Sequence, residues 1–298
     1  MAFSLGQRDS SRMSTTPAAP QMDYGKIEPY DPALYQFSET ITPREGMEAL
    51  TDVDVAQYQA QGFLAIENAF PAGDVVAAAL GLQDLVTGKV PAFQGVMFEV
   101  WAKDRLAELT GEERENAVRK IFDFTAFDAR LKALERHPVL QTAVARLLGA
   151  APVLTQEMAL LKPPRGREKP WHQDHAYFDY PLGTPVVGCW IALDDATPEN
   201  GCMHVLPGSH RAGPQVHFTK RDWQVCDTDV LGRRSAAVPL RAGGLMLFDG
   251  LLLHGTPANQ TNQRRRALQF HYVPTGTQKC PAADRLAVFG AEGKNVTC

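Results

Sequence analysis

The sequence has no long apolar run and no paired cysteine motif. None of its apolar stretches approaches the roughly 20 residues that a membrane-spanning helix requires. Its five cysteines lie far apart, without a Cys-x-x-Cys pair, which excludes a disulfide scaffold and indicates reduced thiols. The N-terminus lacks a positively charged segment followed by an apolar core, so no secretory signal is expected. We therefore expect a cytoplasmic protein that does not associate with a membrane.

The chain also has little net charge. Its 298 residues carry a formal charge of -4, and the pI is near 6.1, which gives no electrostatic reason to expect a nucleic-acid partner. The hydrophobic fraction of 44% and the charged fraction of 21% are typical of a globular protein with a sizeable core. Composition does not determine the oligomeric state.

The N-terminal part of the chain differs in composition from the rest. Residues 1–48 are rich in Ser, Thr, Pro, Gln and Met and predict an extended or partly disordered arm, and a single domain is expected over residues 49–298. Thr51 and Asp54 have the spacing of a helix N-cap, and Gly62 is expected to end that helix. Beyond it, a strand is predicted over residues 62–70, a helix over 71–88 and a helical block over 111–148.

From residue 150 onward, short β-type runs are separated by Gly, Pro and Asn turns. No helix is expected between these runs, which predicts antiparallel sheets arranged as a sandwich or a jelly roll. The predicted fold class is therefore α+β, with the helices first and a double-sheet core after them. The runs cover residues 152–162, 171–178, 185–193, 202–209, 236–255 and 265–274.

The stretch WHQDHAYFDY, residues 171–180, raises the question of a metal site. On a strand, His172 and Asp174 leave the same face and His175 leaves the other, but alone this pattern fits a polar strand equally well. His254, at the end of the most apolar run, is the expected third ligand, and a core histidine bonded to a carbonyl is the alternative. Two neutral imidazoles and one carboxylate suit non-haem Fe(II). No cysteine lies at ligand spacing, which argues against structural zinc.

If a 2-oxo acid binds at this metal, its distal carboxylate needs a cation. The turn after His254 predicts a hairpin, which would bring the following arginines back beside that histidine. A period of two on the next strand places Arg265 on a polar cavity face and Arg266 on an apolar face. Arg265 is therefore the expected bidentate partner of a carboxylate, and Thr256 is expected to add a hydroxyl. A solvated basic turn is the alternative.

These features together resemble the phytanoyl-CoA dioxygenase family of Fe(II)/2-oxoglutarate oxygenases. The resemblance implies a double-stranded β-helix, a distorted cupin-like jelly roll, with N-terminal helices packed on one sheet. It also implies Fe(II), with 2-oxoglutarate and O2 as co-substrates. It covers about residues 51–275 and rests on the segments LTDVDVAQYQAQGFLAIENAF, LLKPPRGREKPWHQDHAYF, GCWIALDDATPENGCMHVLPGSHR and LMLFDGLLLHGTPANQTNQRRRALQFHY.

The family's site residues fall on particular positions of this chain. The resemblance places the iron ligands at His172, Asp174 and His254, and the 2-oxoglutarate arginine at Arg265. It places further co-substrate contacts at Thr256, Trp190, Met158 and Lys120. Gln156 and Lys162 match positions that some members use for substrate or co-substrate. Further candidate pocket residues, chosen by strand face, are Tyr177, Phe178, His204 and Gln269, with plain packing as the alternative.

The resemblance implies a dioxygenase that hydroxylates an unactivated C–H bond of a small-molecule substrate, with release of succinate and CO2. Halogenating relatives replace the carboxylate ligand with a small residue, whereas this chain has Asp174, so hydroxylation, desaturation or cyclisation is expected. No basic cluster for the phosphates of coenzyme A is evident, so a CoA ester is not identified as the substrate. Two alternatives stay open: a cupin-like metalloenzyme that does not use 2-oxoglutarate, which has no need of Arg265, and a non-catalytic binding protein of this family.

Overall fold

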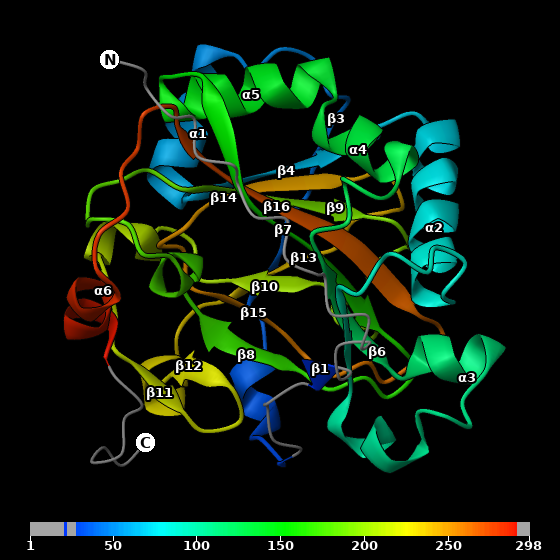
Figure 1. Ribbon diagram of the computed structural model, residues 1–298. Helices are drawn as coiled ribbons and strands as arrows, with labels where there is room; N and C mark the ends of the chain where they lie inside the picture. Colours follow the sequence, from blue (N-terminus) through cyan, green and yellow to red (C-terminus); the bar gives the residue numbers. More distant parts are fainter. Residues whose placement is uncertain (1–20, 23–27, 291–298) are drawn as a thin grey trace, which may run out of the picture.

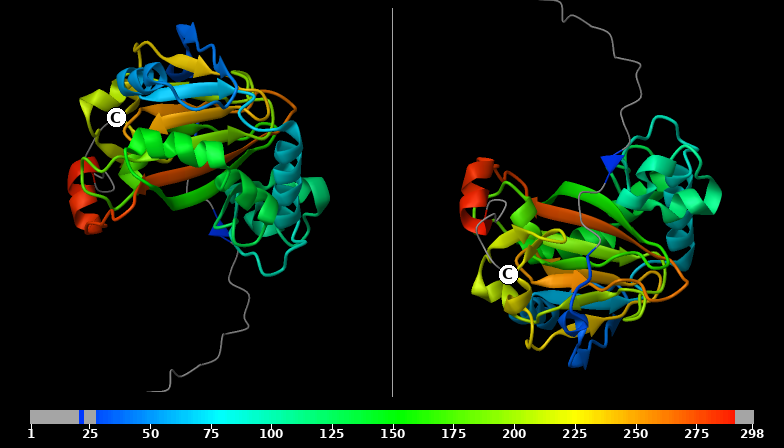
Figure 2. Two further views of the ribbon diagram at one scale, coloured as in Figure 1. Left: turned by 90° about the horizontal axis from the view of Figure 1, so that it is seen from above. Right: turned by 90° about the horizontal axis from the view of Figure 1, so that it is seen from below.

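The structure is a computed structural model that describes residues 21–22 and 28–290. Two β-sheets lie face to face, and helices cover the outer face of the larger sheet (Figures 1 and 2). This arrangement confirms the predicted α+β class, the jelly-roll core and the packing of the N-terminal helices on one sheet. Within the described ranges, no helix has the length and apolar character needed to cross a membrane.

The larger sheet runs through the middle of the molecule and carries one wall of the cavity described below. Its strand order is β1-β5-β6-β7-β16-β9-β14-β4-β3. The central strands β7, β16, β9, β14 and β4 pair antiparallel. In chain order the strands are β1 (Gln21–Met22), β3 (Arg44–Glu45), β4 (Phe63–Glu67), β5 (Val96–Phe98), β6 (Val118–Phe122), β7 (Pro152–Lys162), β9 (Val187–Ala192), β14 (Leu245–Asp249) and β16 (Arg265–Pro274).

The smaller sheet faces the larger one and has the order β2-β13-β10-β15-β8. Its strands are β2 (Glu39–Thr40), β8 (Lys169–His172), β10 (Met203–Val205), β13 (Ala236–Val238) and β15 (His254–Thr256). A separate hairpin is formed by β11 (His217–Thr219) and β12 (Trp223–Val225). Strand β8 is the edge of the smaller sheet, so residues that follow it are free to turn into the space between the sheets.

Alternate residues of the central strands enter two different cores. Cys189 and Ile191 of β9 pack with the helices on the outer face of the larger sheet. Trp190 of the same strand and Met246 of β14 pack toward the smaller sheet. This alternation follows from the period of two in a strand, and it explains why these strands are apolar at every position.

The helices begin and end at residues suited to caps. Thr51 Oγ1 accepts a hydrogen bond from the Asp54 amide, Asp54 accepts one from the Thr51 amide, and Gly62 ends the helix with φ +84°, as predicted. The helices are α1 (Asp52–Gln61), α2 (Ala72–Val86), α3 (Gly111–Asn116), α4 (Ala129–Glu135), α5 (Pro138–Leu148) and α6 (Ala282–Phe289). The 3-10 turns are η1 (Pro32–Tyr35), η2 (Val100–Arg105), η3 (Asp174–Tyr177), η4 (Ser209–Ala212) and η5 (Asp227–Asp229).

The predicted helical block over residues 111–148 is wrong in its middle. Residues Val118–Phe122 form the strand β6, which pairs antiparallel with β5 and β7. Val118 and Ile121 are fully buried in the helical core, so their spacing fits a helix as well as a strand. These residues form a strand because they pair with β7, which is distant in sequence. Local periodicity cannot predict such a pairing.

The predicted hairpin after His254 is also wrong. His254 belongs to β15 in the smaller sheet, whereas Arg265 begins β16 in the larger sheet. Asn259 holds the connection in place, because its side-chain amide donates to the carbonyls of Lys162, Pro163 and Gln263. The run 236–255 likewise divides into β13, β14 and β15, which alternate between the sheets. The chain crosses between layers here, and a jelly roll requires such crossings.

Part of the predicted N-terminal arm lies against the two sheets. Strand β2 pairs parallel with β13, and β3 pairs parallel with β4. Tyr35 of η1 is buried, and its hydroxyl donates to Glu168 over 2.7 Å. Residues 1–20 and 23–27 of the arm lie outside the described part of the chain. The division into an arm and one domain at residue 49 stays a prediction.

Candidate metal centre and active-site cavity

Three buried side chains meet at one end of the space between the sheets. His172 ends β8 and lies opposite His254 of β15 in the strand pairing, while Asp174 begins η3. One ligand atom from each of the three lies within 4.8 Å of the others. None is more than 6% exposed. The predicted triad is therefore assembled.

The orientation of the rings fits metal binding. His172 Nδ1 lies 2.7 Å from the Pro170 carbonyl, and His254 Nδ1 lies 2.9 Å from the Leu252 carbonyl. These carbonyls only accept, so each Nδ1 carries the proton and each Nε2 keeps its lone pair. The two Nε2 atoms lie 3.2 and 3.7 Å from Asp174 Oδ1. Lone pairs from two imidazoles and a carboxylate thus converge.

The protonation states also fit a divalent cation. Burial, together with the electrostatic effects of His254 and Lys169, lowers the pKa of His172 to about 3. Burial likewise lowers the pKa of His254. Burial opposes ionisation of Asp174, but His254, His271 and the hydrogen bonds that it accepts hold its pKa well below the usual range. At neutral pH the set is two neutral imidazoles and one carboxylate, the donor set preferred by non-haem Fe(II).

The local backbone differs from the single strand predicted for residues 171–178. The strand ends at His172, and the chain then turns through η3 from Asp174 to Tyr177. Gln173 fixes this turn. Its backbone amide donates to His217 Nε2, and its side-chain Nε2 donates to the carbonyls of Gly213 and Leu251. His175 does point away from the triad, as predicted, but the turn directs it there rather than a strand pleat. Its ring stacks on Phe289.

At the other end of the cavity, Arg265 presents unused donors. It is 1% exposed, and its Nε and Nη1 have no hydrogen-bond partner among the described residues. Its guanidinium lies 5.4 Å from the ring centre of Trp190, a cation–π contact that orients it. Burial lowers the pKa of Arg265 only to about 10, so it is cationic at neutral pH. Two unpaired donors on a buried cation fit a carboxylate.

Thr256 and Lys162 lie beside this arginine. Lys162 Nζ donates to Thr256 Oγ1 over 2.8 Å and also to the Pro257 carbonyl. A lysine ammonium has no acceptor, so the hydroxyl proton of Thr256 stays free to donate to a ligand. Lys162 thus orients the hydroxyl of Thr256, which is the expected contact of the co-substrate.

A cavity of about 220 Å³ connects the triad to Arg265. Trp190 lies behind it, under Arg265. The predicted residues that line the cavity are Lys120, Gln156, Met158, Lys162, Tyr177, Phe178, Thr256 and Gln269, together with the triad residues and Arg265. Lining residues that the sequence did not indicate are Met97, Arg119, Phe122, Leu160, Leu161, Lys169, Met203 and Gly255.

The prediction that His204 lines the pocket is wrong. His204 is the middle residue of β10, and its neighbour Met203 is the one that faces the cavity. Alternation along the strand turns His204 to the outer face of the smaller sheet, where its ring meets Tyr35 and Phe37 edge to face. The arm therefore covers this histidine.

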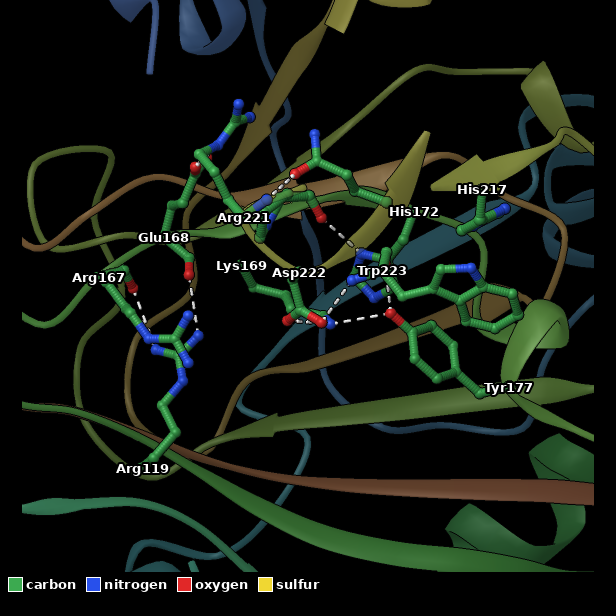
Figure 3. Close-up of polar contacts among 12 residues, drawn as sticks. Arg119, Arg167, Glu168, Lys169, His172, Tyr177, His217, Arg221, Asp222 and Trp223 are labelled. Carbon is green, nitrogen blue, oxygen red and sulfur yellow. Dashed lines mark hydrogen bonds and ion pairs between the residues drawn. The ribbon is translucent and has the colours of Figure 1, made fainter. Parts of the chain in front are cut away.

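Lys169 is a cavity residue that sequence reasoning missed. Figure 3 shows it between Asp222 and Tyr177, beside His172. Lys169 Nζ donates to Asp222 Oδ2 over 2.7 Å and to Tyr177 Oη over 3.0 Å. Lys169 lies three residues before His172 in the sequence. Because β8 begins at Lys169, directly after an irregular loop, the sequence does not predict the direction in which this side chain points.

Comparison with known proteins gives the family. The sequence model described as "Phytanoyl-CoA dioxygenase (PhyH)" matches residues 58–267. The chain belongs to the phytanoyl-CoA dioxygenase family. This family consists of iron- and 2-oxoglutarate-dependent oxygenases, which confirms the recognition and, at the level of the family, the predicted cofactors.

Relatives in the family differ in what they act on. The chain is 26% identical over 266 residues to phytanoyl-CoA dioxygenase domain-containing protein 1 of Danio rerio. That alignment covers 76% of this chain and 91% of that protein. It is 30% identical to the ectoine dioxygenase of Bordetella parapertussis, with 71% of each chain covered. It is 31% identical to the L-proline trans-4-hydroxylase of Streptomyces griseoviridis, over 57% of this chain and 73% of that one.

Two solved structures share the fold. The 2-oxoglutarate-dependent carbocyclase SnoK of nogalamycin biosynthesis superposes with a TM-score of 0.62 at 25% identity, over 80% of this chain and 90% of that one. The EctD protein of S. alaskensis with 2-oxoglutarate and 5-hydroxyectoine superposes with a TM-score of 0.60 at 23% identity, over 84% and 83%. The fold of this chain is therefore shared with proteins whose printed names give different activities.

Proposed function

We propose that this protein is an Fe(II)- and 2-oxoglutarate-dependent dioxygenase that hydroxylates an unactivated C–H bond of a small-molecule metabolite and releases succinate and CO2. The observation that carries the proposal is the shared cavity: three converging metal ligands at one end and the unpaired donors of Arg265 at the other. This is the pair of anchors that a chelating 2-oxo diacid needs.

Each residue has a distinct task in this proposal. His172, Asp174 and His254 would hold Fe(II) through one atom each. Arg265 and the Thr256 hydroxyl bind the distal carboxylate of 2-oxoglutarate, and Trp190 orients Arg265 from behind. When bound, Fe(II) and 2-oxoglutarate supply the activation of O2.

The remaining wall residues shape the substrate region. Met158 lies on β7 opposite Gln269 of β16, so both line the same part of the cavity wall. Gln156, Tyr177 and Phe178 line the side nearer the triad. An enclosed, partly apolar wall limits the access of water to the reacting centre, which protects the oxidising step from side reactions.

One assay separates this function from its rivals. Anaerobic addition of Fe(II) and 2-oxoglutarate is expected to give the weak visible charge-transfer band of a metal-chelated 2-oxo acid. Folded, iron-loaded protein without this band would contradict the proposal and favour a metalloenzyme that does not use 2-oxoglutarate. A band without any substrate-stimulated succinate release across a metabolite screen would instead favour a binding protein.

A further inference from the structure

The C-terminal helix α6 packs against the turn that carries Asp174. It covers Ala282–Phe289 and lies outside residues 58–267, the range that the family model matches, so membership of the family gives this helix no role. Figure 1 shows α6 beside the hairpin formed by β11 and β12. Both elements contact η3, so they lie directly behind one ligand of the metal centre.

Asp174 is the ligand whose backbone depends most on neighbouring elements. His172 and His254 lie on paired strands of the smaller sheet, where ladder hydrogen bonds fix the main chain. Asp174 instead begins the short turn η3, and a 3-10 turn of this length has few hydrogen bonds of its own. The donors on β16 hold its carboxylate, not its backbone. One backbone bond, from the His175 amide to the Gly250 carbonyl, ties η3 to the turn after β14.

Phe289, the last residue of α6, supports both chain neighbours of Asp174. Its ring stacks on the ring of His175 with 5.7 Å between the centres, and it meets the ring of His217 edge to face at 5.9 Å. His217 Nε2 in turn accepts a hydrogen bond from the backbone amide of Gln173 over 3.0 Å. Phe289 is 1% exposed. One buried ring therefore holds His175 directly and Gln173 through His217.

The bond between His217 and Gln173 requires a fixed imidazole. His217 Nδ1 lies 2.8 Å from the Gln215 carbonyl, which only accepts, so Nδ1 carries the proton and Nε2 is free to accept. The rings of Trp223 and Phe289 contact this imidazole and keep it in place. Gln173 is fully buried, so its amide would be left without an acceptor if the imidazole turned away.

Arg285 makes a second connection from α6 to the turn. Its Nη1 donates to the Ala176 carbonyl over 2.9 Å, and its Nε donates to Asp179 over 2.8 Å. Ala176 lies within η3, two residues after Asp174, so the first bond attaches the helix to the backbone of the turn itself. The guanidinium also lies 5.4 Å from the ring centre of Trp223 on β12. Arg285 thus joins α6, η3 and the hairpin.

The same contacts extend to the wall of the cavity. Tyr177, which ends η3 and lines the cavity, donates from its hydroxyl to the Trp223 carbonyl over 2.6 Å. The two rings also meet edge to face at 5.1 Å, and Figure 3 shows Trp223 between Tyr177 and His217. A displaced α6 would therefore disturb both Asp174 and the cavity wall beside it.

We propose that α6 is a clasp that positions Asp174 for metal binding, and that Phe289 and Arg285 are positioning residues of the metal centre. The inference rests on the part of the proposed function that assigns Fe(II) to the triad. Coupling between two binding events is reciprocal. If docking of α6 strengthens metal binding, the metal must strengthen docking of α6 by the same factor.

The test uses the full chain and Fe(II) alone, without 2-oxoglutarate. An anaerobic titration against a chromophoric chelator measures the dissociation constant of Fe(II). Amide hydrogen exchange of residues 282–289, with and without Fe(II), measures the docking of α6. Thermal unfolding of each variant checks that the fold is retained.

The variants are Phe289→Ala, Arg285→Met and Arg285→Lys, the last of which can still donate to η3. Phe70→Ala is the matched control for the ring, because Phe70 is buried in the core between the larger sheet and the helices. Arg146→Met is the matched control for the charge, because Arg146 forms its ion pair on the surface of α5.

Phe289→Ala is expected to weaken Fe(II) binding about tenfold or more, which is the usual cost of removing outer support from a metal ligand. Arg285→Met should weaken it about threefold or more, and Arg285→Lys should recover most of that loss. Phe70→Ala and Arg146→Met should match the wild type. Fe(II) should slow hydrogen exchange in α6 of the wild type by about the factor that Phe289→Ala loses in affinity, and should have little effect on α6 in that variant.

Wild-type affinity for Fe(II) in both Phe289→Ala and Arg285→Met overturns the inference. An equal loss in Phe70→Ala also overturns it, because general destabilisation would then explain the effect. If Phe289→Ala does not fold, Arg285→Met and the exchange of α6 in the wild type decide the question. Wild-type protein that binds no Fe(II) overturns the inference together with the proposed function. Protein that binds Fe(II) but gives no charge-transfer band with 2-oxoglutarate overturns the proposed function alone.

Discussion

His271 Nε2 lies 2.7 Å from Asp174 Oδ2. Gln269 Nε2 donates to the same oxygen over 2.9 Å, so one carboxylate oxygen is fully engaged by β16. The other oxygen, Oδ1, faces the Nε2 atoms of His172 and His254. The two donors thereby fix Asp174 as a ligand that offers a single atom, and they tie the metal centre to the strand that carries Arg265.

His271→Phe is expected to weaken Fe(II) binding by about 10- to 100-fold, the usual cost of removing an outer hydrogen bond to a metal ligand. His271→Gln, which can still donate to Asp174, should recover most of the loss. An anaerobic titration against a chromophoric chelator measures the affinity, and His210→Gln serves as a control on a histidine near α1. If His271→Phe binds Fe(II) like the wild type, β16 does not position the ligand.

Arg265→Gln should raise the dissociation constant of 2-oxoglutarate by about tenfold or more, because it replaces a buried bidentate cation with a neutral amide. Arg266→Gln is the matched control, since Arg266 bonds Asp194 on the surface side of the same strand. The visible charge-transfer band measures the dissociation constant of 2-oxoglutarate for both variants. If both substitutions weaken binding equally, the co-substrate is attracted by the overall positive charge and not by the oriented guanidinium of Arg265.

Lys162→Met tests whether Lys162 acts through Thr256. Removing Lys162 frees the Thr256 hydroxyl to rotate, so 2-oxoglutarate should bind several-fold more weakly, about as in Thr256→Val. The double variant should lose little more than either single one, since both changes remove the same oriented donor. Fully additive losses in the binding titration would show that Lys162 contacts the ligand independently. Thermal unfolding of each variant checks that the fold is retained.

The sequence predicts the parts of this site that local rules govern. The N-cap at Thr51 and the cavity face of Arg265 follow from spacing and strand alternation. His172, Asp174 and His254 meet as predicted, although Asp174 lies on the turn η3 and not on the predicted strand. Arg265 faces the cavity although the predicted hairpin is wrong, because alternation along β16 does not depend on which strand precedes it.

The features that the sequence does not predict depend on contacts between distant segments. Strand β6 forms because β7 offers it a pairing edge, and nothing in residues 118–122 alone distinguishes this from a helix. His204 shows the same limit, because alternation tells which residues of a strand share a face but not which face meets the cavity, and a shift of one residue exchanges the two faces. Lys169 and Asp222 meet across 53 residues, and no local pattern relates them.

The last prediction concerns pH and Lys120. The charged groups that act on it are Lys169, Asp222, Arg119 and Asp174, but burial is the largest cause of its pKa of about 7. A bound carboxylate favours the ammonium form, so binding takes up a proton when the pH exceeds that value. The affinity for 2-oxoglutarate, whose contact with Lys120 the family resemblance implies, should therefore be constant below about pH 6 and fall toward tenfold per unit above about pH 8. Lys120→Met should bind weakly at every pH, with no such slope. A wild-type affinity that stays flat across this range would show that Lys120 does not face the bound anion.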